Sequence, residues 1–526
     1  MTRLIEVLDT TLRDGAQGEG VSFSREDKIK IVHALDALGV DYIEAGNPAA
    51  SPRDAALFAE LARQSGPAHA TLVAFGATCR AGANADNDPG LRALIESEAP
   101  VISLFGKSWR FHVDEVLKVS VEENLRMIGD SVAYLVKYGR RVFFDAEHFF
   151  DGYATDPDYA MATLRAAADA GAERLVLCDT NGGGLSGEFG RITAEVCAQF
   201  DLPVAIHCHN DLGLATAGTL EAVQHGADQV QGTLGGFGER CGNADLCQII
   251  PNLVFKMGFQ CLPDDNLRAL ASSARYIAEV ANTSVPANAP FVGRSAFAHK
   301  GGMHIDGMVK NRRTFEHIDP ESVGNRSRYL ISEMAGRGAL ATRLAALAPD
   351  LRKDSAETGD LVVMFKALEG EGYTFEDADG SLELRILGAL NRRERFFEVL
   401  DFHVISRKPD DARNSQAYVK IQVGDEVEIT AEEGNGPVNA LDLAIRKALT
   451  RFYPALKATR LQDFKVRVVG GSGTASRVRV HIESTDGTNS WATVGVSENV
   501  IEASFIALTD SIEYMLMNEK RKNGEG

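Results

Sequence analysis

Two histidines and one aspartate in this sequence have the types and the setting of metal ligands. His207 and His209 are separated by one residue and follow the short apolar run 202–205. A strand places alternate residues on one face, so both imidazoles would leave its end in the same direction and could share one divalent ion. Asp14 would add a carboxylate oxygen, and Asn243 could add a neutral oxygen. We therefore predict a metal site made of Asp14, His207, His209 and Asn243.

The ligand types also indicate what such a site would do. Nitrogen and oxygen ligands without a thiolate suit Mn²⁺, Mg²⁺, Co²⁺ or Zn²⁺, and the sequence does not choose among them. An ion of this kind can chelate the carboxylate and ketone oxygens of a 2-oxo acid and act as a Lewis acid on the carbonyl. A His-x-His pair alone is more often a pair of ordinary polar or buried residues, so the prediction depends on its agreement with other stretches.

Three further polar residues are candidates for contact with a substrate. Arg13 could place its guanidinium on developing negative charge, and Glu147 could transfer a proton or orient the group that does. The alternative for both residues is an ion pair buried at one end of the fold. Thr180 could hold a substrate carboxylate through its hydroxyl, although a simple turn residue after a strand explains it equally well.

The elements that would position these residues are short apolar runs that alternate with amphipathic helical runs. The expected strands are residues 4–8, 42–45, 71–75, 101–104, 142–145, 175–178, 204–207 and 229–232. Ser24 and Asp27 predict a capped helix start before 26–38. This length and rhythm predict a (β/α)8 TIM barrel, with a doubly wound open sheet as the alternative. In a barrel the candidate residues would all lie at the carboxyl ends of strands, where active sites gather.

The rest of the chain is expected to form two further regions. Residues 265–395 read as a helical linker. Beyond them a pattern of three strands and a helix occurs twice, and the two helices have apolar residues at the same 4, 3, 4 spacing: Leu441, Ile445, Ala448 and Phe452, then Ile501, Phe505, Leu508 and Ile512. We predict a catalytic barrel over 1–264, a linker over 265–395 and a C-terminal α+β domain of two βββα units over 396–526, suited to binding or dimerisation.

Composition excludes several classes of function. The net charge is −19, from 55 basic and 74 acidic residues, which argues against nucleic acid or a membrane surface as the main partner. The N-terminus becomes charged too soon for a signal peptide and no apolar run reaches membrane-spanning length, so we predict a cytoplasmic protein. Seven scattered cysteines form no C-x-x-C pair, which favours neither disulfides nor a structural zinc site. Cys208 and Cys241 could be reactive, but small buried residues are the expectation.

At the candidate site residues the sequence resembles a known family. Residues 12–17 with 43–48, and residues 207–213 with 238–243, are similar to the two signatures of the 2-isopropylmalate, homocitrate and citramalate synthase family. The similarity covers essentially the whole chain, because the βββα repeat resembles the C-terminal regulatory domain of that family. Within the family, residues 105–109 and 178–183 most resemble the citramalate synthases.

The resemblance implies a metal-dependent Claisen condensation of acetyl-CoA with a 2-oxo acid. For the citramalate branch the 2-oxo acid is pyruvate, the products are (R)-citramalate and CoA, and the pathway is isoleucine biosynthesis. The implied metal ligands are Asp14, His207 and His209, with Asn243 nearby. Arg13 and Glu147 are implied to serve enolisation and charge stabilisation.

The resemblance also implies a homodimer and a regulator. His304 matches a linker histidine that the family presents to the barrel of the partner subunit, whereas the sequence alone indicates a surface or packing residue. Phe315 stands where the family often has a tyrosine, so no hydroxyl is available there. Feedback inhibition by a branched-chain amino acid is implied, with isoleucine as the expected effector and leucine as the competitor. Residues 434–437 and 497–499 are candidate pocket loops.

Three alternatives remain open at this point. Another 2-oxo acid would make the chain a 2-isopropylmalate or homocitrate synthase, and pocket side chains discriminate such substrates by only about 1–3 kcal/mol. A lyase of the same superfamily is disfavoured, because lyases generally lack the C-terminal repeat. An amino-acid sensor without catalysis is disfavoured by the intact set of candidate residues.

Overall fold

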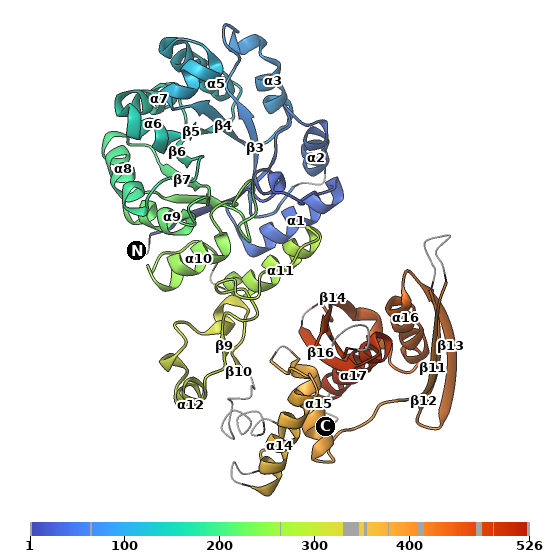
Figure 1. Cartoon of the computed structure of the whole chain (residues 1–526). Coiled ribbons are helices and arrows are strands. Elements are labelled where there is room, and N and C mark those ends of the chain that lie inside the picture. The colour runs from blue at the N-terminus through green and yellow to red at the C-terminus, as the bar shows by residue number, and fades with distance from the viewer. Residues whose placement is uncertain are drawn as a thin grey trace. The chain divides into compact units, whose positions relative to one another are not determined.

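The computed structural model describes most of the chain as two compact units. The described residues are 3–63, 66–263, 265–329, 344, 347–351, 355–376, 378–407, 415–469, 476–487 and 489–522. The first unit comprises Met1–Phe297 with Ile318–Arg326, and the second comprises Ala298–His317 with Ser327–Gly526 (Figure 1). Within these residues, no helix combines the length and the apolar character that crossing a membrane requires.

The first unit is a closed barrel of eight parallel strands. The strands are β1 Glu6–Asp9, β2 Tyr42–Gly46, β3 Thr71–Ala77, β4 Val101–Lys107, β5 Arg141–Glu147, β6 Arg174–Asp179, β7 Val204–Cys208 and β8 Gln229–Gly232. They pair in chain order, and β1 closes the barrel against β8. The predicted TIM barrel is confirmed, and the alternative of an open sheet is wrong.

Helices surround the barrel strands (Figure 1). They are α1 Arg25–Leu38, α2 Pro52–Arg63, α3 Pro89–Glu96, α4 Arg110–His112, α5 Val121–Lys137, α6 Phe149–Thr155, α7 Pro157–Asp169, α8 Ser186–Gln199, α9 Ala215–Gln224, α10 Leu246–Phe255 and α11 Leu270–Val280. The predicted cap of α1 is confirmed: the Asp27 amide donates to Ser24 Oγ at 3.1 Å, and the Ser24 amide donates to the Asp27 carboxylate at 3.1 Å.

Apolar side chains that point into the barrel form its floor. Eight of them make one buried cluster, with one member on each of six strands and two on β6: Leu8, Tyr42, Val73, Val101, Phe143, Val176, Cys178 and Ala205. Because all strands are parallel, their carboxyl ends meet at one rim above this floor. The inward residues that follow the floor along each strand therefore lie together at that rim.

The second unit begins with a mainly helical region. The parallel strands β9 Ala298–His299 and β10 Arg328–Tyr329 pair with each other, and the helices are α12 Gly302–Lys310, α14 Ala356–Gly370 and α15 Asp379–Ala389. The described part of the expected linker is thus helical with short strands. The boundaries at 264 and 395 stay predictions, and Asp264 itself lies outside the described residues.

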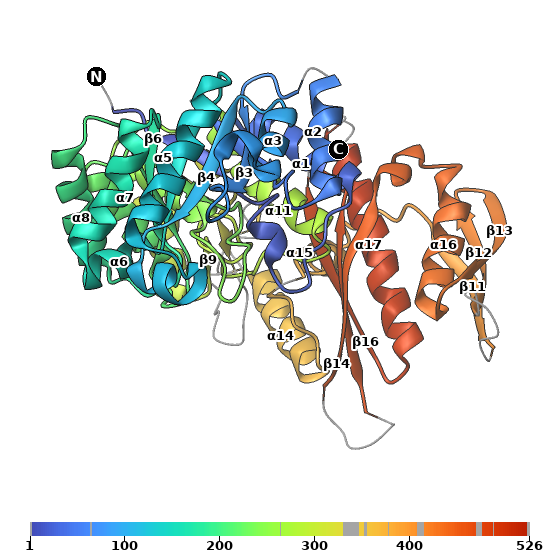
Figure 2. The ribbon, with the colours of Figure 1, turned by 90° about the horizontal axis from the view of Figure 1, so that it is seen from above.

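The predicted pair of βββα units is confirmed. The first consists of β11 Glu398–Ser406, β12 Ser415–Val423, β13 Glu426–Gly434 and α16 Pro437–Thr450, and the second of β14 Arg460–Val468, β15 Val478–Thr485, β16 Ser490–Ser497 and α17 Val500–Lys522. Both sheets are antiparallel. Their central strands are β12 and β15, so the strands of each sheet lie in the order of the chain. Figure 2 shows α17 beside the sheet that contains β14 and β16, and α16 beside the other sheet.

The two βββα units share one apolar core. Ile421 of the first sheet and Ile482 of the second sheet are fully buried in it, together with Leu441 of α16 and Leu508 of α17. The apolar spacing that revealed the repeat therefore marks the buried faces of the two helices.

A buried ionic cluster ties α17 to the segment that precedes β11. Arg393 Nη2 lies 3.0 Å from Asp510 Oδ1, and Arg393 Nε donates to Glu513 Oε2 at 2.9 Å. Ser381 Oγ donates to the other oxygen of Asp510 at 2.9 Å. Burial raises the pKa of Glu513, and the charge of Arg393 opposes that shift. One guanidinium thus compensates two buried carboxyl groups.

We expect Arg393→Met to lower the free energy of unfolding by about 3 kcal/mol, because it leaves two buried carboxyl groups without a counter-charge. Arg392→Met is the matched control, since Arg392 pairs with the exposed Asp350 and its loss should cost less than about 1 kcal/mol. Urea denaturation of both variants measures the difference. Equal losses would show that the cluster does not stabilise the fold in this way.

Candidate functional site

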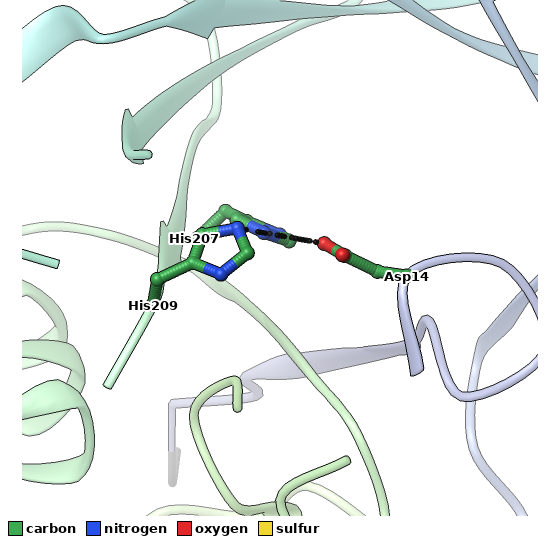
Figure 3. Close-up of side chains that lie close together, drawn as sticks. All are labelled: Asp14, His207 and His209. Carbon is green, nitrogen blue, oxygen red and sulfur yellow. Dashed lines mark ion pairs between the residues drawn. The ribbon is translucent and has the colours of Figure 1, made fainter. Parts of the chain in front are cut away.

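The structure brings three predicted metal ligands together at the barrel rim. Asp14 follows β1, His207 lies in β7 and His209 follows that strand by one residue. Asp14 Oδ2 lies 3.1 Å from His207 Nε2 and 3.7 Å from His209 Nε2 (Figure 3). All three side chains are buried, and their candidate ligand atoms lie within 4.8 Å of one another. The spacing of two residues did place both imidazoles on the same side of the strand end.

Asn243 lies beside these residues with an unsatisfied oxygen. Its backbone bridges to that of His209, and its side-chain nitrogen donates to the Phe237 carbonyl at 3.1 Å. Its Oδ1 is buried and has no hydrogen-bond partner. A buried carbonyl oxygen without a partner is costly unless a ligand satisfies it. Two imidazoles, a carboxylate and this amide oxygen form a donor set that fits a divalent ion.

Gln231 orients one of the imidazoles. Its Oε1 lies 3.2 Å from His207 Nδ1, and the two residues are neighbours across β7 and β8. An amide oxygen only accepts, so His207 donates from Nδ1 and turns Nε2 towards Asp14. Gln231 Nε2 in turn donates to Gln229 Oε1 at 3.3 Å. The sequence analysis did not identify Gln229 or Gln231. Both are polar and stand at alternate positions of the expected strand 229–232, which could have indicated that they point into the barrel.

Electrostatics favour the metal-binding forms of Asp14 and His209. Burial opposes ionisation of Asp14, but Arg13 and His207 hold the pKa of its carboxyl well below the usual range. Burial and the neighbouring His207 lower the pKa of His209 to about 4, so this imidazole is neutral at neutral pH. For His207, burial opposes protonation, but the hydrogen bond to Asp14 raises the pKa. A carboxylate and a neutral imidazole are the forms that bind metal.

Arg13 is fixed between an aromatic ring and two carboxylates. Its Nε donates to Glu44 Oε2 at 2.5 Å, and its Nη1 lies 3.3 Å from Asp14 Oδ2. Its guanidinium carbon lies 3.8 Å from the centre of the Phe75 ring. Glu44 is fully buried on β2, so its carboxylate contacts Arg13 and is not exposed to solvent. Sequence reasoning gave Glu44 no role, although a carboxylate inside an expected strand was the available signal.

Glu147 and Thr180 lie at the ends of the next strands. Glu147 is the last residue of β5 and forms an ion pair with Lys107, the last residue of β4. Thr180 follows β6, and its hydroxyl oxygen accepts a hydrogen bond from the His148 amide at 2.9 Å. The hydroxyl hydrogen of Thr180 is thereby left to donate to another group. All predicted site residues of the first unit lie at the carboxyl ends of strands.

Asp145 is a buried carboxyl group that sequence reasoning did not use. It lies two residues before Glu147 on the inward side of β5, and Ser103 Oγ lies 3.0 and 3.1 Å from its two oxygens. Burial and the charge of Glu44 raise its pKa to about 7. Burial therefore favours the protonated form of this carboxyl group.

The remaining predicted residues lie elsewhere. His304 belongs to α12 in the second unit, where its exposed ring stacks on Phe315 with centroids 4.2 Å apart. The role of His304 at a partner's barrel stays a prediction. Cys208 is buried as expected, whereas the expectation of burial is wrong for Cys241, which is exposed.

Comparison with known proteins covers the whole chain. Residues 4–277 match the HMGL-like family, residues 291–372 match the homocitrate synthase post-HMGL domain-like family, and residues 376–516 match the LeuA allosteric (dimerisation) domain. The chain is 49% identical over 526 residues to an (R)-citramalate synthase of Aquifex aeolicus, with 99% of each chain covered.

The chain belongs to the 2-isopropylmalate, homocitrate and citramalate synthase family. An (R)-citramalate synthase of Geobacter sulfurreducens is 48% identical to it, again with 99% of each chain covered. A probable 2-isopropylmalate synthase of Methanopyrus kandleri is 31% identical over 510 residues, with 97% of each chain covered. The relatives named as citramalate synthases are thus clearly more similar to this chain than that isopropylmalate relative.

We expect Gln231→Met to weaken Mn²⁺ binding about 10- to 100-fold, because His207 loses the partner that orients its ring. Isothermal titration of the purified chain measures the affinity directly. Gln229→Met is the control, since Gln229 contacts Gln231 and not the histidine, and we expect a smaller loss. Unchanged Mn²⁺ affinity in Gln231→Met would contradict the orienting role.

We expect the stability of the metal-free protein to fall as pH rises from about 4 to about 7, partly because of Asp145. Its raised pKa means that the folded state keeps a proton that the unfolded state loses in this window. Asp145→Asn should flatten this slope and gain about 2 kcal/mol at pH 8. Urea denaturation in EDTA across this range is the measurement.

Some slope remains in that variant, because the pKa of buried Asp9 is also raised to about 7. Asp130→Asn, at an exposed aspartate, is the control and should leave the slope unchanged. A slope in Asp145→Asn equal to that of the parent would rule Asp145 out as its source.

Proposed function

We propose that this protein is an (R)-citramalate synthase, which condenses acetyl-CoA with pyruvate and releases (R)-citramalate and CoA for isoleucine biosynthesis. The observation that carries the proposal is the identity of 43–49%, over nearly the full length, to five (R)-citramalate synthases, against 29–33% to three known or probable 2-isopropylmalate synthases. The intact rim of Asp14, His207 and His209 supports an active enzyme of this class. Enzymes of this kind are acyltransferases that convert the acyl group into an alkyl group on transfer.

Each residue at the rim would have its own role in the reaction. A divalent cation held by Asp14, His207, His209 and Asn243 would polarise the ketone of pyruvate. The free hydroxyl hydrogen of Thr180 would donate to the pyruvate carboxylate. Arg13, which is fixed by Glu44, would lie beside the negative charge that develops on the former ketone oxygen.

Glu147 would serve the proton transfer that starts the reaction. The methyl group of acetyl-CoA would lose a proton to Glu147, and the electron pair of that C–H bond would form the new C–C bond to the ketone carbon of pyruvate. The π pair of the C=O bond would move to the ketone oxygen, which takes up a proton and becomes the hydroxyl of citramalate. Water then cleaves the thioester, which releases CoA and leaves the second carboxylate of citramalate. A side chain positioned for such a transfer contributes about 10²- to 10⁴-fold to the rate.

The second unit would supply dimerisation and regulation. The match of residues 376–516 to the LeuA allosteric (dimerisation) domain supports a homodimer, in which His304 of one subunit would serve the barrel of its partner. It also supports inhibition by a branched-chain amino acid, with isoleucine as the expected effector. A cavity of about 530 Å³ at predicted loop 497–499 supports such binding, because Arg477 could meet a carboxylate and Glu498 and Glu502 an ammonium group.

The test is release of free thiol from acetyl-CoA with pyruvate, 2-oxobutyrate, 2-oxoisovalerate or 2-oxoglutarate, with and without EDTA. We expect pyruvate to be turned over best, EDTA to abolish the activity, and isoleucine to inhibit it more than leucine. Glu147→Gln should lower kcat by about 10²- to 10⁴-fold, because it removes the proton acceptor.

The other outcomes point to the alternatives. Best turnover of 2-oxoisovalerate would make the protein a 2-isopropylmalate synthase, and best turnover of 2-oxoglutarate would make it a homocitrate synthase. The absence of thiol release with any 2-oxo acid and any of Mn²⁺, Mg²⁺, Co²⁺ or Zn²⁺ would favour a non-catalytic amino-acid sensor.

A further inference from the structure

Lys107 lies opposite Glu147 at the barrel rim. The two residues end β4 and β5, and their Cα atoms are partners in the strand register. The Lys107 ammonium forms an ion pair with Glu147 Oε2, and the two side chains are 18% and 23% exposed. We propose that Lys107 is a positioning residue of the active site, which holds the Glu147 carboxylate in one orientation for proton transfer. The inference rests on the proposed function of Glu147.

The backbone around Lys107 is held on both sides. Its carbonyl oxygen accepts a hydrogen bond from Asn124 Nδ2 of α5 at 2.8 Å, and Asn124 is fully buried. The next amide, that of Ser108, donates to the Glu147 carbonyl at 3.0 Å. The ends of β4 and β5 are therefore tied together, and the ammonium and the carboxylate start from fixed points.

Aromatic rings connect this ammonium to the other cation of the site. Lys107 Nζ lies 5.6 Å from the centre of the Phe105 ring, which stacks on Phe75 at 5.1 Å and 15°. The guanidinium of Arg13 lies over that same Phe75 ring. A cation over a ring is attracted by the negative face of the ring. The stack therefore favours a folded-back position of Lys107 at the rim over one that extends into solvent.

The charge of Lys107 matters because the other groups around Glu147 do not replace it. His112 of α4 faces the pair, but burial and the neighbouring His148 lower its pKa, so it is neutral at neutral pH. The thiol of Cys178 on β6 has a pKa that burial raises well above its usual value, so it carries no charge either. Asp145 on the same strand adds negative charge as it ionises. The Lys107 ammonium therefore supplies the positive charge that contacts the Glu147 carboxylate.

A purely structural ion pair is the competing explanation, and the chain offers a matched example. Lys28 Nζ lies 2.7 Å from Asp54 Oδ1, with side chains that are 12% and 14% exposed. This pair joins α1 to α2 and contains none of the proposed site residues. It is buried more deeply than the Lys107–Glu147 pair, so its removal should cost at least as much stability. An effect of Lys107 on catalysis beyond that of Lys28 would separate the two explanations.

The experiment compares Lys107→Met, Lys107→Arg, Glu147→Gln, the Lys107→Met/Glu147→Gln double variant and Lys28→Met in the full chain. Thiol release from acetyl-CoA with pyruvate is measured across pH. We expect Lys107→Met to lower kcat about 10- to 100-fold with little change in KM for pyruvate, and to change the pH profile of kcat. Lys107→Arg should retain most of kcat and the parental profile, and Lys107→Met should cost nothing further in the Glu147→Gln background. Lys28→Met should keep the parental kcat and profile.

Each other result overturns the inference. Full activity and an unchanged pH profile in Lys107→Met, or effects that add to those of Glu147→Gln, would make the pair structural. A raised KM with an unchanged kcat would make Lys107 a substrate-binding residue. Thermal unfolding checks the fold, and Lys107→Gln replaces Lys107→Met if that variant does not fold. If the unmodified protein turns over another 2-oxo acid best, the variants are assayed with that acid in place of pyruvate. If the unmodified protein releases no thiol with any 2-oxo acid, the proposed function and this inference are both overturned.

Discussion

The buried carboxylate of Asp14 is the constraint on which the rest of the site depends. A charge removed from water is stable only with partners of opposite charge or good hydrogen bonds. Here Arg13 and the imidazole of His207 supply them. Arg13 is itself held by the buried Glu44, so the requirement extends from the rim to the inside of β2. Carboxyl groups outnumber permanent cations in this region, which makes it a natural place for a divalent ion.

The barrel meets this constraint through the alternation of its strands. An apolar floor fills the interior, and several of the inward residues above it are polar: Glu44, Ser103, Asp145, His207 and Gln231. Above them, Lys107, Glu147 and Thr180 end or follow their strands. The layer of buried polar groups orients the residues that face the substrate, as Gln231 does for His207. The chemistry at the rim is therefore supported by contacts one step deeper along each strand.

The second unit is stabilised by a shared apolar core and by buried ion pairs. A helix covers one face of each three-stranded sheet, and both sheets share one core, which supplies the apolar contacts that a small sheet needs. The ionic cluster of Arg393, Asp510 and Glu513 adds a specific polar contact between α17 and the chain before β11. This arrangement has no cluster of reactive groups comparable to the barrel rim among the described residues, in keeping with a role in binding and assembly.

The sequence by itself determined the elements and the faces of this protein. Apolar runs and helical spacing predicted the barrel and the βββα repeat, and the period of two residues in a strand placed His207 and His209 on one side. Only the tertiary structure decided which side chains meet across strands, such as Arg13 with Glu44, Lys107 with Glu147 and His207 with Gln231. Strand periodicity defines the face of each residue, but the neighbour opposite it depends on the register between strands. That register is set when the barrel closes, and no local pattern in the sequence records it.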